Sequence, residues 1–316
     1  MAWTIPDKGE GDNDLQSILF QEYLEVLVDG INGLNCVVSG CAVTGGADMT
    51  PEVAKGAVLS NGTLFAVAAS TVAIGAADAT NPRIDLVVVT SAGALTVRAG
   101  TASASPKPPA RTANDVVLAA VYVPAGDTSI ETTKITDLRV VRSRNITLAK
   151  TTTAVAFNNT AAQQTYFSLT LPSGLATTGK VFRMRCGGTF LLNSGTPTLT
   201  LAILFGGVAV FQDATGTATA DVDRGAWQVD MIMVSQANND HAFNGICALS
   251  PVAAKTAPTA GAAGDISIAT PLITPINASS VGDGDLADRV LALAWTMSTA
   301  NASNEVVMEY AVLELL

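Results

Sequence analysis

From Leu34 onward, apolar residues recur at every second position in short runs that glycine- and proline-containing turns interrupt. Side chains of an extended strand point alternately to the two faces of a sheet, so this period indicates β-structure. The stretch from Gly56 to Val67 has two such runs around Asn61-Gly62, a pair suited to the positive φ angles of a tight hairpin turn. The pattern therefore predicts a chain built largely of antiparallel hairpins.

The first block of strands, residues 34–143, has the turn spacing of a β-sandwich. A strand is expected from Ile84 to Val89, with a turn at Ser91-Ala92-Gly93 before its partner from Ala94 to Ala99. Another strand is expected from Val116 to Val123. The proline-rich stretch from Ser103 to Arg111 is predicted to be a loop that crosses between strands.

The second block, residues 144–316, is longer and has the size of a two-sheet jelly roll of about eight to ten strands. Its segments place aromatic and aliphatic side chains on one face, as in Phe182, Met184 and Cys186, with Arg183 and Arg185 on the other. The predicted fold class is all-β, with an N-terminal helix followed by two β-sandwich domains, the second jelly-roll-like. At 316 residues the chain has the length of about two domains.

Residues 1–33 carry the one segment with helical spacing. Asn13 and Gln16 stand at the spacing of a capping box, and Asp29-Gly30 is a typical helix end. Two interpretations stay open: the helix packs on its own domain, or it anchors the protein to a larger particle. The residues that would form the anchor recur on one side of this helix: Leu15, Ile18, Leu19, Tyr23, Val26 and Leu27.

The last strand is apolar on both faces, which is unusual for a strand that leaves one face in water. One face would fill the sandwich core, so something else must cover the other. A neighbouring copy in a homotrimer is the preferred cover, and the loop from Pro251 to Gly264 is the alternative. The predicted trimer interface comprises Val306, Val307, Met308, Tyr310, Val312, Leu313 and Leu315.

The charge balance restricts the partners. The net charge is −10, charged residues make up only 14% of the chain, and the few basic residues are scattered. Nucleic-acid backbones and anionic membranes select clustered lysine and arginine, so we expect neither as a partner. No apolar run is long enough to span a membrane, and the acidic N-terminus does not resemble a secretory signal.

The four cysteines predict no metal site, because none stands at CxxC spacing and a single histidine cannot complete a zinc site. Cys186 and Cys247 lie in apolar runs and are expected to be buried, reduced thiols, consistent with synthesis in a cytoplasm. Cys36 and Cys41 are expected to be reduced as well, with a bridge across a hairpin as the alternative.

Catalytic patterns are missing, so the sequence predicts no enzyme, no catalytic residue and no cofactor. The lone histidine, His241, lies in a polar stretch and is expected in a solvated turn. Trp227 and Trp295 alternate with apolar residues and are expected in the core. Two acidic groups leave weaker alternatives open. Asp283, Asp285 and Asp288 would suit calcium, and Asp213, Asp221 and Asp223 would suit a glycosidase pair.

Three stretches resemble the virion appendage proteins of tailed phages. The block from Asn81 to Val141, with NPRID, a proline-rich loop and VVLAAVYVPAG, resembles a module of tail and appendage proteins. The start, from Met1 to Ile31, is similar to the anchoring segment of tail-fibre-type proteins. The stretch from Tyr166 to Gly207 is similar to the jelly-roll head of trimeric appendages. The resemblance implies an assembly protein of the virion exterior, usually trimeric.

These expectations combine into one functional prediction: a non-enzymatic tail or baseplate appendage that presents a β-sandwich head for host-surface attachment. Its partners would be two further copies of itself, other virion proteins through the N-terminal segment, and a host-surface glycan or protein. The first alternative is a capsid-surface fibre or decoration protein that stabilises the shell. The second is a virion-associated glycan-active enzyme.

Overall fold

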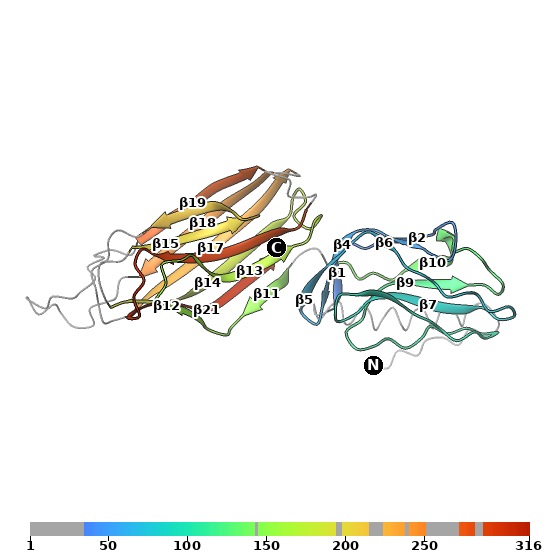
Figure 1. The fold of residues 1–316 in the computed structure, drawn as a ribbon. Coiled ribbons are helices and arrows are strands. Elements are labelled where there is room, and N and C mark those ends of the chain that lie inside the picture. Colours follow the sequence, from blue (N-terminus) through green and yellow to red (C-terminus); the bar gives the residue numbers. More distant parts are fainter. Residues whose placement is uncertain are drawn as a thin grey trace, which may run out of the picture. The chain divides into compact units, whose positions relative to one another are not determined.

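The computed structural model describes residues 35–142, 145–193, 198–214, 224–237, 240–250, 272–281 and 287–316. The chain divides into two compact units, Met1–Ser143 and Arg144–Leu316. Figure 1 shows that both units consist of strands arranged in sheets.

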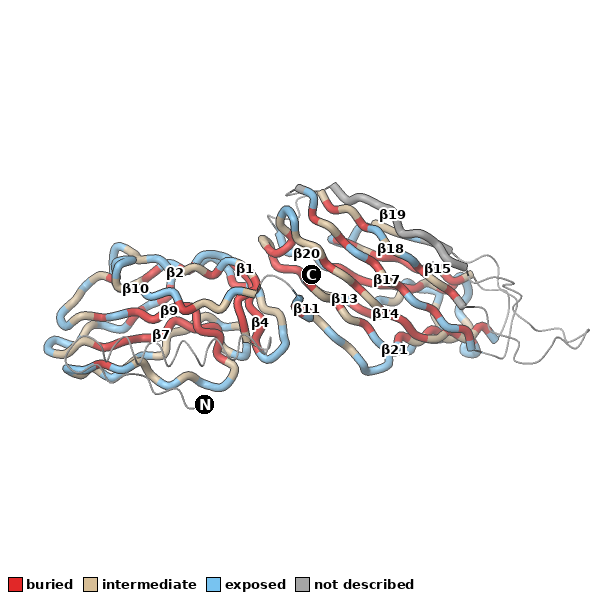
Figure 2. Tube along the Cα trace, turned by 180° about the vertical axis from the view of Figure 1, so that it is seen from behind, coloured by how far each residue is buried: buried red, intermediate tan, exposed pale blue. Residues whose placement is uncertain are grey.

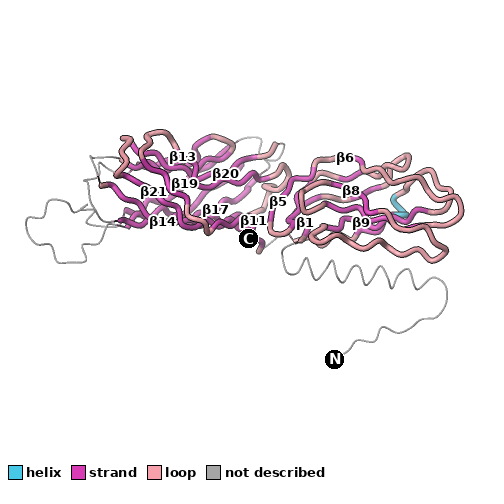
Figure 3. The backbone as a smooth tube through the Cα atoms, turned by 60° about the horizontal axis from the view of Figure 1, so that its bottom comes forward, coloured by secondary structure: helices cyan, strands magenta, loops and turns pink. Residues whose placement is uncertain are grey.

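The predicted fold class needs one correction, because it placed a helix before the sandwiches. The described residues contain strands and a single 3-10 turn, η1 (Thr132–Lys134), but no α-helix. Figure 3 shows this turn as the short cyan segment of the first unit. The segment predicted to be helical, with its six proposed anchoring residues, lies outside the described residues. The fold class that the structure supports is all-β.

The first unit contains three antiparallel sheets. The first has the order β1 (Cys36–Gly40), β4 (Gly56–Ser60) and β5 (Thr63–Val67). The second has the order β10 (Ile135–Asp137), β9 (Val116–Val123), β7 (Arg83–Val89) and β8 (Leu95–Arg98). The third has the order β2 (Val43–Thr44), β3 (Glu52–Val53) and β6 (Ser70–Thr71).

The predicted hairpin from Gly56 to Val67 is confirmed. Strands β4 and β5 pair in register, and the turn residues Asn61 and Gly62 have φ angles of 48° and 74°. These positive angles match the twist of the two strands that the turn connects. The strands predicted from Ile84 to Val89 and from Val116 to Val123 are confirmed as β7 and β9, which are buried along nearly their whole length.

The second unit is a two-layer sandwich. The large sheet contains β11 (Ile146–Thr151), β21 (Asn304–Leu315), β14 (Val181–Leu192), β17 (Arg224–Ala237), β18 (Asp240–Ser250) and β19 (Leu272–Val281), in that order. In addition, β12 (Val155–Asn158) pairs with β21. The small sheet contains β13 (Gln164–Leu171), β20 (Arg289–Met297), β15 (Leu199–Phe205) and β16 (Val208–Ala214), in that order.

The strand pairs of this unit are nested like the turns of a jelly roll. Strands β11 and β12 pair with β21, β13 with β20, β14 with β17, and β15 with β16. Successive pairs alternate between the large and the small sheet. The hairpin of β18 and β19 lies between β17 and β20 in sequence and extends the large sheet beyond β17. First and last strands of the unit thus become neighbours.

The core of the second unit lies between its two sheets. Trp227 of the large sheet and Trp295 of the small sheet are both 2% exposed, and their rings meet edge to face at 5.5 Å. The prediction that both are core residues is confirmed. The rings of Phe205 and Phe243 make a second contact between the sheets, at 5.7 Å.

All four cysteines are buried and none forms a disulfide, so the alternative of a bridge between Cys36 and Cys41 is wrong. Burial raises the pKa of both of these thiols to about 11, against the opposing effect of Arg142 and Arg139 respectively. Burial raises the pKa of Cys186 as well. A thiol held in its neutral form is a weak nucleophile, so these cysteines act as small apolar core residues.

Candidate assembly interface

The large sheet of the second unit has one face in the core and one turned outward. In β14, Phe182, Met184 and Cys186 are fully buried, whereas Arg183 and Arg185 on the opposite face are only partly buried. Strands β17 and β21 alternate in the same way, as the burial colours of Figure 2 show. We call the outward side of these strands and β18 the assembly face. Its main residues are Val181, Arg183, Arg185, Asp230, Ile232, Ile246, Val307, Tyr310, Val312 and Glu314.

The arginines and carboxylates of the assembly face form ion pairs with one another. Arg183 contacts Asp230 at 2.5 Å, and Arg185 contacts Glu314 at 3.0 Å. The hydrogen bond from the Arg183 guanidinium holds the pKa of Asp230 below its ordinary value, so this carboxylate is charged at neutral pH. These four charges sum to zero. The exposed side chains of Lys150, opposite Val312, and Glu309, next to Tyr310, add one charge of each sign. The centre of the assembly face therefore carries little net charge, although the whole chain carries a net charge of −10.

A third ion pair extends this arrangement along the sheet. Arg224 of β17 contacts Glu305 of β21, so the pair crosses β14, which lies between these strands. Like the two others, it joins groups within one chain. Each of the three arginines has a carboxylate partner on its own sheet, and the aliphatic side chains between these pairs are the groups that a partner could contact.

Apolar side chains fill the space between the ion pairs. Ile232 and Tyr310 are each 37% exposed and Ile246 is 47% exposed, while Val307 and Val312 are partly buried. Clustered apolar residues on an outward sheet face are typical of protein–protein interfaces. By contrast, on the outward side of β20 only Val290 is exposed. The neighbouring Ala292 and Ala294 are small and already buried.

The structure divides the predicted trimer interface into two sets. Val306, Met308, Leu313 and Leu315 are at most 1% exposed and lie in the core of the single chain, so they cannot contact a neighbouring copy. Val307, Tyr310 and Val312 point outward on the assembly face. The sequence did not separate the two sets correctly, because a β-bulge shifts the alternation within the last strand.

This bulge places Tyr310 on the outward side. Opposite Gly187 and Gly188 of β14, β21 inserts one additional residue, so Gly187 pairs with Tyr310 and Gly188 with Met308. Val306 and Met308 before the bulge, and Ala311 and Leu313 after it, are all buried. Sequence reasoning missed this feature, although the adjacent glycines inside a strand were a signal for it.

His241 is not in a solvated turn, and that prediction was wrong. The residue lies in β18 with an exposed fraction of 0%, because its side chain points into the sandwich. Its Nδ1 lies 3.1 Å from the Ser235 hydroxyl, and its ring packs edge-on against Phe205 at 5.0 Å. Because the His241 side chain is buried between the two sheets, it cannot contact a substrate in solution, and we assign this residue to the core.

The acidic alternatives gain no geometric support. Asp288 accepts a hydrogen bond from the Ser173 backbone N–H at 2.8 Å, and Asp213 pairs with Leu201 across β16 and β15. Asp221, Asp223, Asp283 and Asp285 lie outside the described residues. Within the residues that the structure does describe, no three His, Cys, Asp or Glu side chains form a group that could hold a metal ion.

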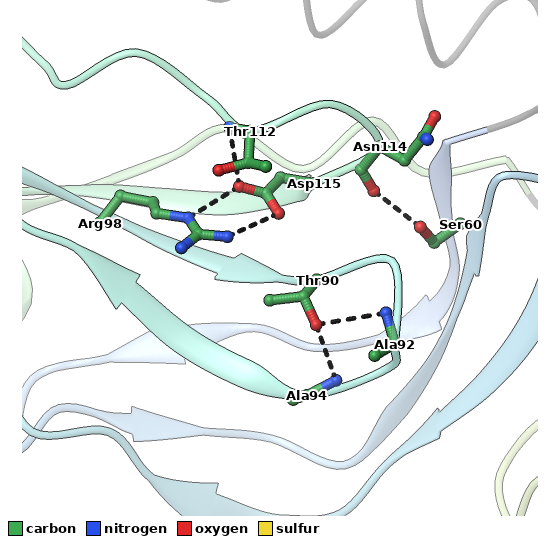
Figure 4. A network of polar contacts seen from close by, with 8 residues as sticks. All are labelled: Ser60, Thr90, Ala92, Ala94, Arg98, Thr112, Asn114 and Asp115. Carbon is green, nitrogen blue, oxygen red and sulfur yellow. Dashed lines mark hydrogen bonds and ion pairs between the residues drawn. The ribbon is translucent and has the colours of Figure 1, made fainter.

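A cluster of polar side chains in the first unit connects a loop to neighbouring strands (Figure 4). The Arg98 guanidinium donates two hydrogen bonds to the Asp115 carboxylate, at 2.9 and 3.1 Å, and the Thr112 N–H donates to the same carboxylate at 3.1 Å. The Ser60 hydroxyl donates to the Asn114 carbonyl at 2.7 Å. These bonds fix the end of the proline-rich loop against two sheets.

Comparisons with known proteins leave the family open. No protein-family model matches the chain, and no curated protein matches it. Solved structures of infectious bursal disease virus show remote similarity. The Gt strain structure is 13% identical with a TM-score of 0.20, and the alignment covers 76% of this chain and 63% of that chain. The VP2 subviral particle is 11% identical with a TM-score of 0.22, and the alignment covers 93% and 86%. Scores this low carry no argument about fold or function.

In the described part of the chain, no helix is long and apolar enough to cross a membrane.

Proposed function

We propose that this chain is a non-enzymatic structural protein of a virion, which assembles as a homotrimer through the assembly face. The observation that carries the proposal is the composition of that face. Its three ion pairs are each neutral, its exposed Lys150 and Glu309 carry opposite charges, and Ile232, Tyr310 and Ile246 are its exposed apolar side chains. An acidic chain can bring copies of such a face together without opposing like charges.

The role proposed for the assembled protein is attachment to a host surface. A tail or baseplate appendage with three heads would bind a surface glycan or protein at three equivalent positions. Sites that are weak individually gain strength through the effective concentration that a shared support creates. The support for this role is the all-β jelly-roll architecture together with the resemblance of Asn81–Val141 and Tyr166–Gly207 to phage appendage modules.

The oligomeric state can be measured directly. Light scattering of the full chain at micromolar concentration should give the mass of three 32.2 kDa chains. The variant Ile232→Lys places an additional positive charge beside Arg183 on the assembly face and should yield monomers, because an unpaired buried charge is costly. Val290→Lys is the matched control on the outward side of the small sheet, where the exposed fraction is 41%. It should leave the trimer intact.

A monomeric wild-type chain would refute the trimer. A trimer that Ile232→Lys leaves intact and Val290→Lys disrupts would instead assign the interface to the small sheet.

The role of the protein within the particle can be tested with virions that lack it. Loss of adsorption to host cells supports the attachment role. Virions that adsorb normally but release DNA on mild heating would contradict it in favour of a decoration protein.

A further inference from the structure

We infer that Tyr310 is the anchor of the homomeric contact, and that Gly187 positions its ring. The inference rests on the assembly role proposed above and adds which side chain the contact depends on. It begins from the bulge that pairs Gly187 of β14 with Tyr310 of β21.

The tyrosine lies across the neighbouring strand. A Cβ atom built on Gly187 would stand 3.0 Å from both Cε1 and the hydroxyl oxygen of Tyr310, and 3.0 Å from the Trp227 carbonyl oxygen of β17. The ring therefore extends from β21 over the backbone of β14 toward β17. A side chain at position 187 would press against the ring and require it to shift, whereas glycine leaves the ring in place.

A ring held in this way suits an anchor for three reasons. Tyrosine offers a large contact area with only two side-chain torsions, so little conformational entropy is lost when a partner covers it. The ring is 37% exposed, which leaves area for such a partner. Burial raises the pKa of Tyr310, so its phenol stays neutral and remains a hydrogen-bond donor at physiological pH.

The surroundings favour a second copy of this chain as the partner. Arg185 stands across the strand pair from Val312, two residues beyond Tyr310, and its charge is met by Glu314. The exposed charges near the ring, Glu309 and Lys150 opposite Val312, have opposite signs, so a second copy of the same face brings no net charge against them. Aromatic residues at the centre of an interface are typical energetic hot spots.

The test compares variants of the full chain by sedimentation equilibrium. Tyr310→Ala should raise the protein concentration needed for half-assembly by about tenfold or more. Tyr310→Phe keeps the ring and should stay within about threefold of wild type. Tyr122→Ala is the matched control, since Tyr122 is also 37% exposed but lies in β9 of the first unit, and it should leave assembly unchanged.

The positioning role of Gly187 is tested by a double-mutant cycle. Gly187→Ala should weaken assembly in the wild-type background and have no further effect in the Tyr310→Ala background, because the ring that it displaces is then missing. Thermal unfolding of the dissociated variants shows whether the fold is kept. If Gly187→Ala does not fold, the Tyr310 variants decide the anchor by themselves.

These measurements distinguish a failure of the proposed trimer from a failure of the Tyr310 anchor. A wild-type chain that never assembles refutes the proposed function and, with it, the anchor. A wild-type trimer whose half-assembly concentration is the same for Tyr310→Ala refutes the anchor alone, as does a trimer that Tyr122→Ala weakens equally.

Discussion

At the scale of single residues, a buried ion pair explains the NPRID motif. Arg83 and Asp85 stand two positions apart in β7, so their side chains lie on the same face, where Nε of Arg83 is 3.0 Å from the Asp85 carboxylate. Arg83 also donates to the carbonyls of Gly75 and Ala76, and Asp85 accepts from the Gly100 N–H. The pair thus holds the loop at Gly75 and Ala76 and the loop at Gly100 against the sheet that contains β7.

Removal of one partner should therefore be costly. Asp85 is fully buried, so Asp85→Ala leaves the Arg83 charge without its counter-ion and should destabilise the chain by about 3–5 kcal/mol. Chemical denaturation with a probe in the first unit would measure this loss. Asp137→Ala is the control, because it breaks an ion pair with Arg139 whose carboxylate is 60% exposed. That change should cost no more than about 1 kcal/mol; equal losses would refute the role of burial.

At the scale of elements, the bulge between β14 and β21 determines which side chains of β21 point outward. Gly188 is its tightest point, since a Cβ atom there would lie 2.0 Å from the Val307 carbonyl oxygen. A regular pairing would reverse the orientation of every residue on one side of the bulge. Two adjacent glycines thus allow β21 to bury Met308 and Leu313 while Tyr310 stays outside.

Gly188→Ala should consequently disrupt this strand pair. The new methyl group meets backbone on the neighbouring strand, which cannot rotate away, so a loss of about 3 kcal/mol is expected. Thermal unfolding would detect it. The control is Gly75→Ala, whose methyl group would meet only Nη2 of Arg83, at 3.6 Å. Unchanged stability of Gly188→Ala would show that the bulge tolerates a side chain.

At the scale of the whole molecule, ion pairs between arginine and aspartate in both units make stability depend on pH. Hydrogen bonds from arginine lower the pKa of Asp137 in the first unit and of Asp230 in the second. A carboxyl group whose pKa is lower in the folded state stabilises the fold at any pH above its unfolded value, which is about 3.9 for aspartate. The contribution is lost as the pH falls through the folded value, because the proton then binds the native state too.

The melting temperature should therefore be nearly constant between about pH 7 and pH 5 and should fall below about pH 4. Asp230→Asn removes one of the groups responsible. It should melt at a lower temperature than wild type at pH 7, and the difference should shrink in acid. Differential scanning calorimetry across this range measures both effects. A difference that grows on acidification would contradict the assigned sign.

The sequence by itself determined the β-architecture, the hairpin at Asn61-Gly62 and the core positions of Trp227 and Trp295. These depend on local periodicity and turn chemistry, which act between residues near one another in the chain. Only the tertiary structure decided that His241 is buried, that Arg183 meets Asp230, and that Tyr310 faces outward while Met308 faces the core. Each of these depends on pairing between distant strands, and a one-residue bulge changes the outcome without altering the local pattern.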